Sequence, residues 1–274
     1  MSSKVQKHPI DEATRNTISS RYKRITKAVN RTFWDSDSET MHSMYVGSYG
    51  RGTAIKTSDL DVLIELPLEE YDRFTSVYGN GQSRLLQAVR GAILDTYPKS
   101  DIKGDGQVVV VSFADEIVFE ILPAFRSEAI WGGDGTYKYP DTHMGGNWMS
   151  TNPKAEIDAI KEKDKEENTN HLLTATCQHI RYVRDKNYSS YKLSGIVIDS
   201  FVYAVIGGWH YCRGGEEREN SMQTYEEHLL QKYNDLSRNG LISPSLRAPG
   251  SDMAVDSSKG WDVLGKILNY MVMV

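Results

Sequence analysis

The sequence predicts an α+β protein in which strands and helices alternate in the first part and helices fill the rest. Short runs typical of strands lie within residues 44–122. A stretch rich in Gly, Pro, Asp and Asn covers residues 131–153, which favours a long irregular connection, and helical periodicity dominates after it. We therefore expect a first domain over residues 1–150 and a helical domain over residues 151–274.

Helices and strands of the first domain are predicted from apolar spacing. Apolar residues recur every three or four positions in the helices and alternate or form short runs in the strands, the first two of which stop at Gly47 and Pro67. The expected elements are an N-terminal helix at 11–29, strands at 44–46 and 60–66, a helix at 83–97, and a hairpin of strands at 108–113 and 117–122.

Composition places the chain among globular proteins with a buried core. Of its 274 residues, 39% are hydrophobic and 25% are charged, and 37 acidic against 32 basic side chains give a net charge of −5. Nucleic acid is therefore not a required partner, because only a local basic patch could attract it. Two cysteines build no disulfide framework, and we see neither a signal-peptide core nor the ~20 apolar residues of a membrane helix. We expect a cytoplasmic protein without membrane contact.

The first chemically informative feature lies where the strand at 44–46 ends. Gly47 lets the backbone approach a ligand closely, and Ser48 offers its amide and hydroxyl at the start of a helical turn. Such an arrangement is typical of phosphate binding. Gly-Ser alone also occurs in ordinary turns between a strand and a helix, so its meaning depends on the residues after it.

Acidic side chains come next, at a spacing that favours metal binding. Asp59 and Asp61 are two residues apart on a strand, so both carboxylates point to one face and repel each other. A divalent cation relieves this repulsion, and we expect Mg²⁺, with Mn²⁺ as a substitute. Glu120 is a lone carboxylate in an apolar strand, which is costly unless it is paired or bound to metal. With Glu120 as third ligand, two ions about 3.5 to 4 Å apart would stabilise the attacking and leaving oxygens.

Other acidic residues nearby have simpler interpretations. Asp115 and Glu116 are expected in the hairpin turn, and Glu65, on the same strand face as Asp61, is expected to be exposed to solvent or paired in a salt bridge. Asp59 alone could cap the start of its strand, but the pair of aspartates together with Glu120 favours a metal site.

These motifs resemble those of the DNA polymerase β-like nucleotidyltransferase superfamily. More narrowly, the runs GSYGRGTAIKTSDLDVLIEL, FEILPAF and GGNWMSTNPK are similar to those of the bacterial cGAS/DncV-like nucleotidyltransferases, called CD-NTases. The resemblance also extends to animal cyclic GMP-AMP synthase and oligoadenylate synthases, and covers the first half better than the second. It implies a catalytic domain with a mixed twisted sheet, and a helical domain that closes the NTP cleft.

The same resemblance implies roles for individual residues. The catalytic and metal-binding triad carries over to Asp59, Asp61 and Glu120, and the phosphate-binding Gly-Ser to Gly47 and Ser48. Relatives hold the triphosphate with a basic residue on a helix of the second domain. The matching positions here are Arg184, where many relatives have Lys, Arg181 one turn earlier, and Ser194 at the next helix start.

The implied reaction joins NTPs into a cyclic di- or oligonucleotide with release of pyrophosphate. Such a product is a second messenger in antiphage defence and acts on a separate effector protein. Two alternatives remain open from the sequence. One is a nucleotidyltransferase that modifies RNA, protein or a small molecule, and the other is an inactive sensor that binds nucleotide or RNA. The three acidic residues speak against the inactive sensor, which has no physical need for repelling carboxylates.

Overall fold

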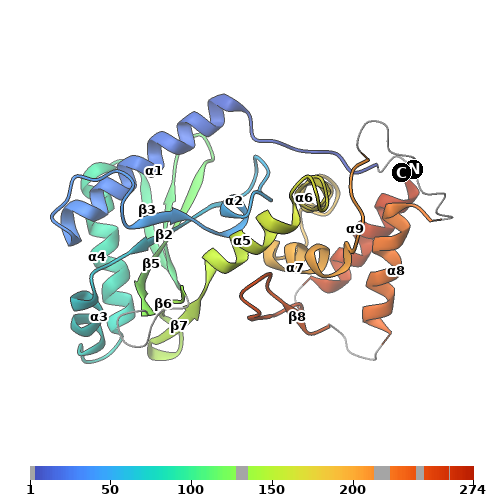
Figure 1. Ribbon diagram of the computed structural model, residues 1–274. Coiled ribbons are helices and arrows are strands. Elements are labelled where there is room, and N and C mark those ends of the chain that lie inside the picture. Colours follow the sequence, from blue (N-terminus) through green and yellow to red (C-terminus); the bar gives the residue numbers. More distant parts are fainter. Residues whose placement is uncertain (1–3, 128–134, 213–222, 239–243, 259) are drawn as a thin grey trace. The chain divides into compact units, whose positions relative to one another are not determined.

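The computed structural model describes residues 4–127, 135–212, 223–238, 244–258 and 260–274 (Figure 1). Its contacts divide the chain into two compact units. The sheet unit consists of Asp11–Gly50 and Asp59–Lys154, and the helical unit consists of Met1–Ile10, Arg51–Ser58 and Ala155–Val274. The short segment Arg51–Ser58 thus belongs to the helical unit, although the residues on either side of it belong to the sheet unit.

The sheet unit contains a mixed sheet, as the sequence predicted. Its main strands run in the order β1-β2-β5-β4-β3; β2 and β5 are parallel, and the other neighbours are antiparallel. The strands are β1 (Ser43–Tyr45), β2 (Leu60–Glu65), β3 (Asp101–Asp105), β4 (Val108–Ser112), β5 (Val118–Arg126), β6 (Tyr137–Asp141) and β7 (Asn147–Thr151). The strands expected at 44–46 and 60–66 and the hairpin are confirmed to within a few residues.

Helices of the sheet unit pack on one another and on its strands. They are α1 (Glu12–Phe33), the single turn α2 (Gly47–Gly50), α3 (Leu68–Thr75), α4 (Gly81–Thr96) and the short 3-10 turn η2 (His143–Gly145). Asp11 caps α1 by accepting a hydrogen bond from the Thr14 amide, and the buried stripe of α1 includes Ile18, Ile25 and Val29. α1 contacts α4 and β2, and α4 also contacts β3 and β4.

The expected irregular connection at 131–153 is wrong where the structure describes it from 135 onward. β6 and β7 form an antiparallel hairpin there, and β6 pairs with the end of β5, with Phe125 opposite Lys138. Gly, Pro and Asn in this stretch suggested a loop, but Tyr137 is buried against Val46, Leu63 and Ala124 and ties the hairpin to the sheet. Residues 131–134 lie outside the described part.

The helical unit is built around two apolar helices. α7 (Gly195–Val205) and α9 (Trp261–Met273) contribute many of the fully buried side chains of its core, among them Phe201 and Leu264. The remaining elements are α5 (Pro153–Lys163), α6 (Leu172–Asn187), α8 (Tyr225–Ser237) and a hairpin of β8 (Leu246–Arg247) with β9 (Ala254–Val255). Within the described ranges, none of the helices is both long and apolar enough to cross a membrane.

Candidate active site

The Gly-Ser turn lies directly against the first acidic strand. Gly47 comes after β1 with a φ of 55°, and a Cβ on it would lie 1.8 Å from Oδ2 of Asp61. The Val46 amide donates a hydrogen bond of 2.9 Å to the Asp61 carbonyl, which fixes this approach. Glycine is therefore required at position 47 for two reasons, the backbone conformation and the space that the Asp61 carboxylate occupies. Ser48 is the next residue within α2.

The acidic residues come from two neighbouring parallel strands. Asp61 on β2 stands opposite Glu120 on β5, and Asp59 immediately precedes β2. The register thus confirms that Glu120 lies on the strand beside Asp61, whereas Asp59, which was also expected on the strand, lies one residue before β2 begins. Parallel pairing places both carboxylates at the same level of the sheet, which brings like charges together.

Glu120 has a strongly perturbed carboxyl group. Burial, the charges of Asp61 and Asp59 and a hydrogen bond with Asp61 raise the pKa of Glu120 from 4.5 to about 7. The raised pKa means that the Glu120 carboxyl holds its proton to a higher pH than an ordinary glutamate, and the hydrogen bond lets that proton be shared with the Asp61 carboxylate. A proton shared between carboxylates is what a bound cation replaces, so the donor set fits a hard divalent ion.

The three candidate carboxylates do not form a closed cage of metal ligands. Within the described ranges, no three His, Cys, Asp or Glu side chains are gathered closely enough to hold a metal ion among them. Asp59, Asp61 and Glu120 instead interact through their charges, and Glu120 shares a hydrogen bond with Asp61. Their oxygen ligands, the aspartate spacing and the close backbone at Gly47 nonetheless suit Mg²⁺, which takes few carboxylates and keeps its other positions for water and phosphate.

Competing acidic residues are engaged elsewhere. Glu65 accepts a salt bridge of 3.1 Å from Arg126, which is the paired role that the sequence left open for it. Asp115 pairs with Arg21 at 2.8 Å, and Glu116 has a φ of 67° in the hairpin turn. These contacts give the competing residues structural roles, so they do not displace the predicted triad as the candidate metal ligands.

Basic residues expected to hold the triphosphate lie on α6 in different environments. Arg181 is 1% exposed, and its guanidinium donates to Asp199 at 2.7 Å and to the carbonyls of Cys177 and Gly195 at 3.2 and 3.0 Å. Arg184 lies at the margin of the core, where it donates to Asp185 at 2.6 Å. The expected role of both in nucleotide binding stays a prediction, and Arg184 has the more accessible guanidinium.

Ser194 occupies the N-cap position of α7. Its backbone is extended, its side chain is exposed, and no hydrogen bond from its side chain caps the helix. This placement agrees with the expected position at the start of the helix, while its contact with nucleotide stays a prediction.

Sequence reasoning missed a buried ionic network in the helical unit. Asp199 is fully buried in α7, where Arg181 and Arg51 both donate to it, and Arg51 also pairs with Glu156 at 2.7 Å. Burial raises the pKa of Asp199, but the charges of the two arginines outweigh this effect and lower it to about 2. The available signal was Asp199 itself, a single charge inside the otherwise apolar sequence of α7.

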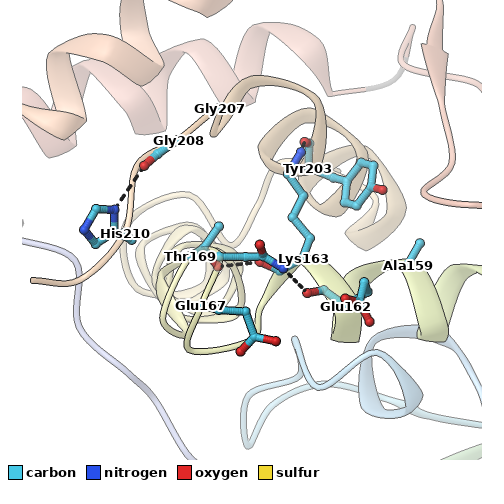
Figure 2. A pocket seen from close by; sticks show the side chains of 10 residues that line it. Ala159, Glu162, Lys163, Glu167, Thr169, Tyr203, Gly207, Gly208 and His210 are labelled. Atoms are coloured by element: carbon cyan, nitrogen blue, oxygen red, sulfur yellow. Dashed lines mark hydrogen bonds between the residues drawn. The ribbon is translucent and has the colours of Figure 1, made fainter. Parts of the chain in front are cut away.

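A hollow of about 570 Å³ is present in the helical unit, and none of the residues that line it belongs to this network. Figure 2 shows Lys163 within it, where the ammonium donates to the Tyr203 carbonyl at 2.7 Å and lies 4.3 Å from the centre of the Tyr203 ring. Burial lowers the pKa of Lys163. Glu162 and Glu167 also line the hollow, so its charge is mixed, and none of the predicted site residues contributes to it.

Comparison with known families assigns the chain. The sequence profile of the Second Messenger Oligonucleotide or Dinucleotide Synthetase domain matches residues 5–164, which is more than half of the chain. The chain belongs to this family. It is a bacterial cGAS/DncV-like nucleotidyltransferase, or CD-NTase, and the resemblance seen in its motifs is confirmed. Comparison with curated protein sequences finds no match.

Solved structures of other CD-NTases share the fold. The CdnE cyclic dinucleotide synthase of Elizabethkingia meningoseptica, solved with GTP and Apcpp, is 15% identical with a TM-score of 0.64, over 97% of this chain and 93% of that one. CdnG of Bradyrhizobium diazoefficiens, in complex with GTP, is 13% identical with a TM-score of 0.64, over 98% and 86%. The Vibrio cholerae cyclic AMP-GMP synthase DncV is 12% identical with a TM-score of 0.60, over 97% and 85%. The predicted fold class is therefore confirmed.

Proposed function

We propose that this CD-NTase binds two Mg²⁺ ions through Asp59, Asp61 and Glu120 and joins NTPs into a cyclic di- or oligonucleotide. The observation that supports this proposal best is the pairing of Asp61 with Glu120 on adjacent parallel strands, with the pKa of Glu120 raised to about 7 by burial and by the two aspartates. Repulsion between two carboxylates destabilises a pair that has only a structural role, whereas a bound cation relieves it and gains affinity from the two negative charges.

The carboxylates would serve as ligands and as proton acceptors. When bound, the divalent ions supply positive charge that stabilises the attacking and leaving oxygens. A pKa near 7 lets Glu120 release its proton at neutral pH, so that it presents an oxygen ligand or accepts the proton of the attacking hydroxyl. Mn²⁺ would substitute, since it accepts the same oxygen ligands.

Phosphate groups would be held by backbone and side-chain donors. Gly47 brings the backbone close to Asp61, and Ser48 offers an amide and a hydroxyl to a phosphate oxygen. Arg184 would hold the triphosphate as a planar fork where relatives use the point charge of Lys. Arg181 and Ser194 would add further contacts to the nucleotide, although the guanidinium of Arg181 already donates to Asp199.

The proposed reaction balances as a phosphoryl substitution. A ribose hydroxyl oxygen of one nucleotide forms a bond to the α-phosphorus of an NTP, the bond from that phosphorus to the bridging oxygen breaks, and pyrophosphate leaves with that oxygen. The hydroxyl proton passes to a carboxylate. A second round of the same chemistry closes the ring. The cyclic product would act in the cytoplasm as a second messenger of antiphage defence, read by a separate effector protein.

A product assay tests this proposal. Purified protein is incubated with all four labelled NTPs and Mg²⁺ or Mn²⁺, the products are treated with phosphatase, and the double variant Asp59→Ala, Asp61→Ala serves as the control. We expect a phosphatase-resistant product from the wild type only, with both proteins folded by circular dichroism. Product that forms only after RNA, a protein or a small molecule is added would contradict cyclisation and indicate a transferase with a separate acceptor.

A further inference from the structure

We propose that Arg51 and Asp199 are positioning residues that hold the segment Arg51–Ser58 and thereby set the place of Asp59. The inference rests on the proposed function in one respect, since it takes Asp59 as a metal ligand. It assigns a role to a buried ionic network that the proposed chemistry does not otherwise use.

The path of the chain makes this segment unusual. Gly47 and Ser48 precede the segment and Asp59 comes after it, and all three belong to the sheet unit, whereas Arg51–Ser58 belongs to the helical unit by its contacts. The segment contains no helix or strand, so no regular hydrogen-bond ladder holds it. Its conformation therefore depends mainly on side-chain contacts, and the backbone joins its last residue, Ser58, directly to Asp59.

Arg51, the first residue of the segment, is held by ion pairs that are buried from solvent. The Nε of Arg51 donates to Oδ2 of Asp199 at 2.9 Å, and its Nη1 donates to Oε2 of Glu156 at 2.7 Å. The Arg51 side chain is 6% exposed and that of Asp199 is fully buried. The Thr53 hydroxyl donates to the same Asp199 oxygen at 2.9 Å, so one carboxylate holds two residues of the segment.

Further contacts hold the segment as far as Ser58, its last residue. The Gln178 side-chain amide donates to the Gly52 carbonyl at 3.1 Å, and Ala54 and Ile55 are buried. The Thr57 hydroxyl donates to Asp185 at 2.5 Å. The Ser58 amide then donates to the Ile55 carbonyl at 2.9 Å, directly before Asp59. Each of these three hydrogen bonds joins residues of the helical unit.

The shape of the arginine side chain explains why the contacts of Arg51 fix its orientation. The planar guanidinium of Arg51 presents Nε and Nη1 to two different carboxylates, so its orientation is fixed by both. Arg181 donates to the other oxygen of Asp199 and neutralises the remaining charge. A lysine at position 51 could keep a positive charge but could not reproduce the fork.

Variants that loosen the segment with little change in volume test the proposal. Thr53→Val removes the hydroxyl that donates to Asp199, Thr53→Ser keeps it, and Arg51→Lys keeps the charge without the fork. Thr176→Val is the matched control, because it deletes a buried hydroxyl of α6 that bonds to Tyr225 and the Leu172 carbonyl and touches no residue of the segment in those bonds. Hydrogen exchange, Mn²⁺ affinity and the kcat and KM of product formation are measured for each.

We expect Thr53→Val and Arg51→Lys to speed amide exchange over residues 47–61 while exchange in α9 stays as in the wild type. A misplaced metal ligand should lower kcat by up to about 10²-fold and weaken Mn²⁺ binding, with KM for NTP changed less. Thr53→Ser should restore the wild-type values, and Thr176→Val should keep kcat at a temperature where it is folded.

Several results would overturn the proposal. Exchange over residues 47–61 that equals the wild type, unchanged Mn²⁺ affinity, or faster exchange throughout α9 would each show that the network serves stability alone. The proposed function fails separately, if the wild type yields no product. In that case altered exchange and Mn²⁺ affinity in Thr53→Val would still support the positioning role, and unaltered values would overturn it.

Discussion

Replacing Glu120 by Gln should stabilise the metal-free protein above neutral pH. In the folded protein Glu120 holds its proton up to about pH 7, because burial and the two aspartates raise its pKa from 4.5. The folded protein therefore binds more protons than the unfolded chain between these values, and the free energy of unfolding falls as the pH rises through this window. Gln keeps the shape of the side chain and cannot ionise, so the variant escapes this loss.

The size of the effect comes from the pKa values. The rise from 4.5 to about 7 sets a ceiling of about 3 kcal/mol at 1.36 kcal/mol for each pKa unit. Solvent screens a partly exposed group, so we expect about 1 to 2 kcal/mol. For a protein of this size, that free energy raises Tm by roughly 2 to 8 °C.

Thermal unfolding across this pH range, without metal and with Mg²⁺ or Mn²⁺, measures the effect. Without metal, the variant should match the wild type below pH 4.5 and exceed it above pH 7. The cation should raise the Tm of the wild type, because a metal that binds only the folded state stabilises it. It should raise the Tm of the variant much less, because the variant lacks one of the proposed ligands. Glu65→Gln is the control, since Glu65 lies on the same strand as Asp61 but pairs with Arg126. A Glu120→Gln variant that is less stable at high pH, or that keeps the full metal effect, would refute the reasoning.

The remaining predictions concern the turn, the triphosphate and His179, whose ring nitrogen Nδ1 lies 3.2 Å from Nε2 of His8. Gly47→Ala should displace Asp61 and lower the free energy of unfolding in urea by about 1 to 3 kcal/mol. The control Gly91→Ala in α4, where a Cβ meets nothing within 4 Å, should leave that free energy unchanged or raise it. Equal effects of the two substitutions would contradict the close approach of Gly47 to Asp61. Arg184→Ala should raise KM for NTP with little change in Tm, and an unchanged KM would exclude its phosphate role. Burial lowers the pKa of His179 from 6.5 to about 4, so the folded protein binds fewer protons than the unfolded chain between these values. Acidification through this window should therefore remove about 1 to 2 kcal/mol of stability, and His179→Gln should abolish that pH dependence in urea unfolding.

Local patterns were enough to predict the acidic strands and the turn before them. Asp59, Asp61 and Gly47 lie within one short stretch, where spacing alone decides which side chains share a face. Glu120 was predicted because a carboxylate inside an apolar strand needs a partner. The register that places it opposite Asp61 joins strands 59 residues apart in the chain, and local patterns predict the strands but not that register.

Contacts between distant residues account for the elements that the sequence did not predict. The hairpin of β6 and β7 has a loop-like composition and gains its place from the buried Tyr137 and from pairing with the end of β5. β3 was missed because only Ile102 of that strand is buried, so its sequence lacks the alternation that marks a strand. Both are cases in which tertiary contacts outweigh local propensity.

Arg181 and Arg184 illustrate the same limit on one helix. They are three residues apart on α6, so both were expected to face a triphosphate. Arg181 lies four positions after the buried Cys177 and continues the apolar face inward, where Asp199 accepts its hydrogen bond. Arg184 lies at the edge of that face. Helical spacing places Arg181 inward, but only the opposing carboxylate on α7 offsets the cost of burying its charge.

The buried ionic network around Asp199 raises the question of why charged side chains occupy these positions. Buried ion pairs are weak sources of stability, because apolar side chains of similar volume often serve equally well. The reason that we propose for the charges of Arg51, Asp199 and Arg181 is the geometry that they specify. Apolar contacts tolerate sliding, whereas a guanidinium shared between two carboxylates has one orientation that satisfies both. The segment Arg51–Ser58 contains no helix or strand and ends directly before Asp59. A fixed orientation of Arg51 therefore matters most for the position of this proposed metal ligand.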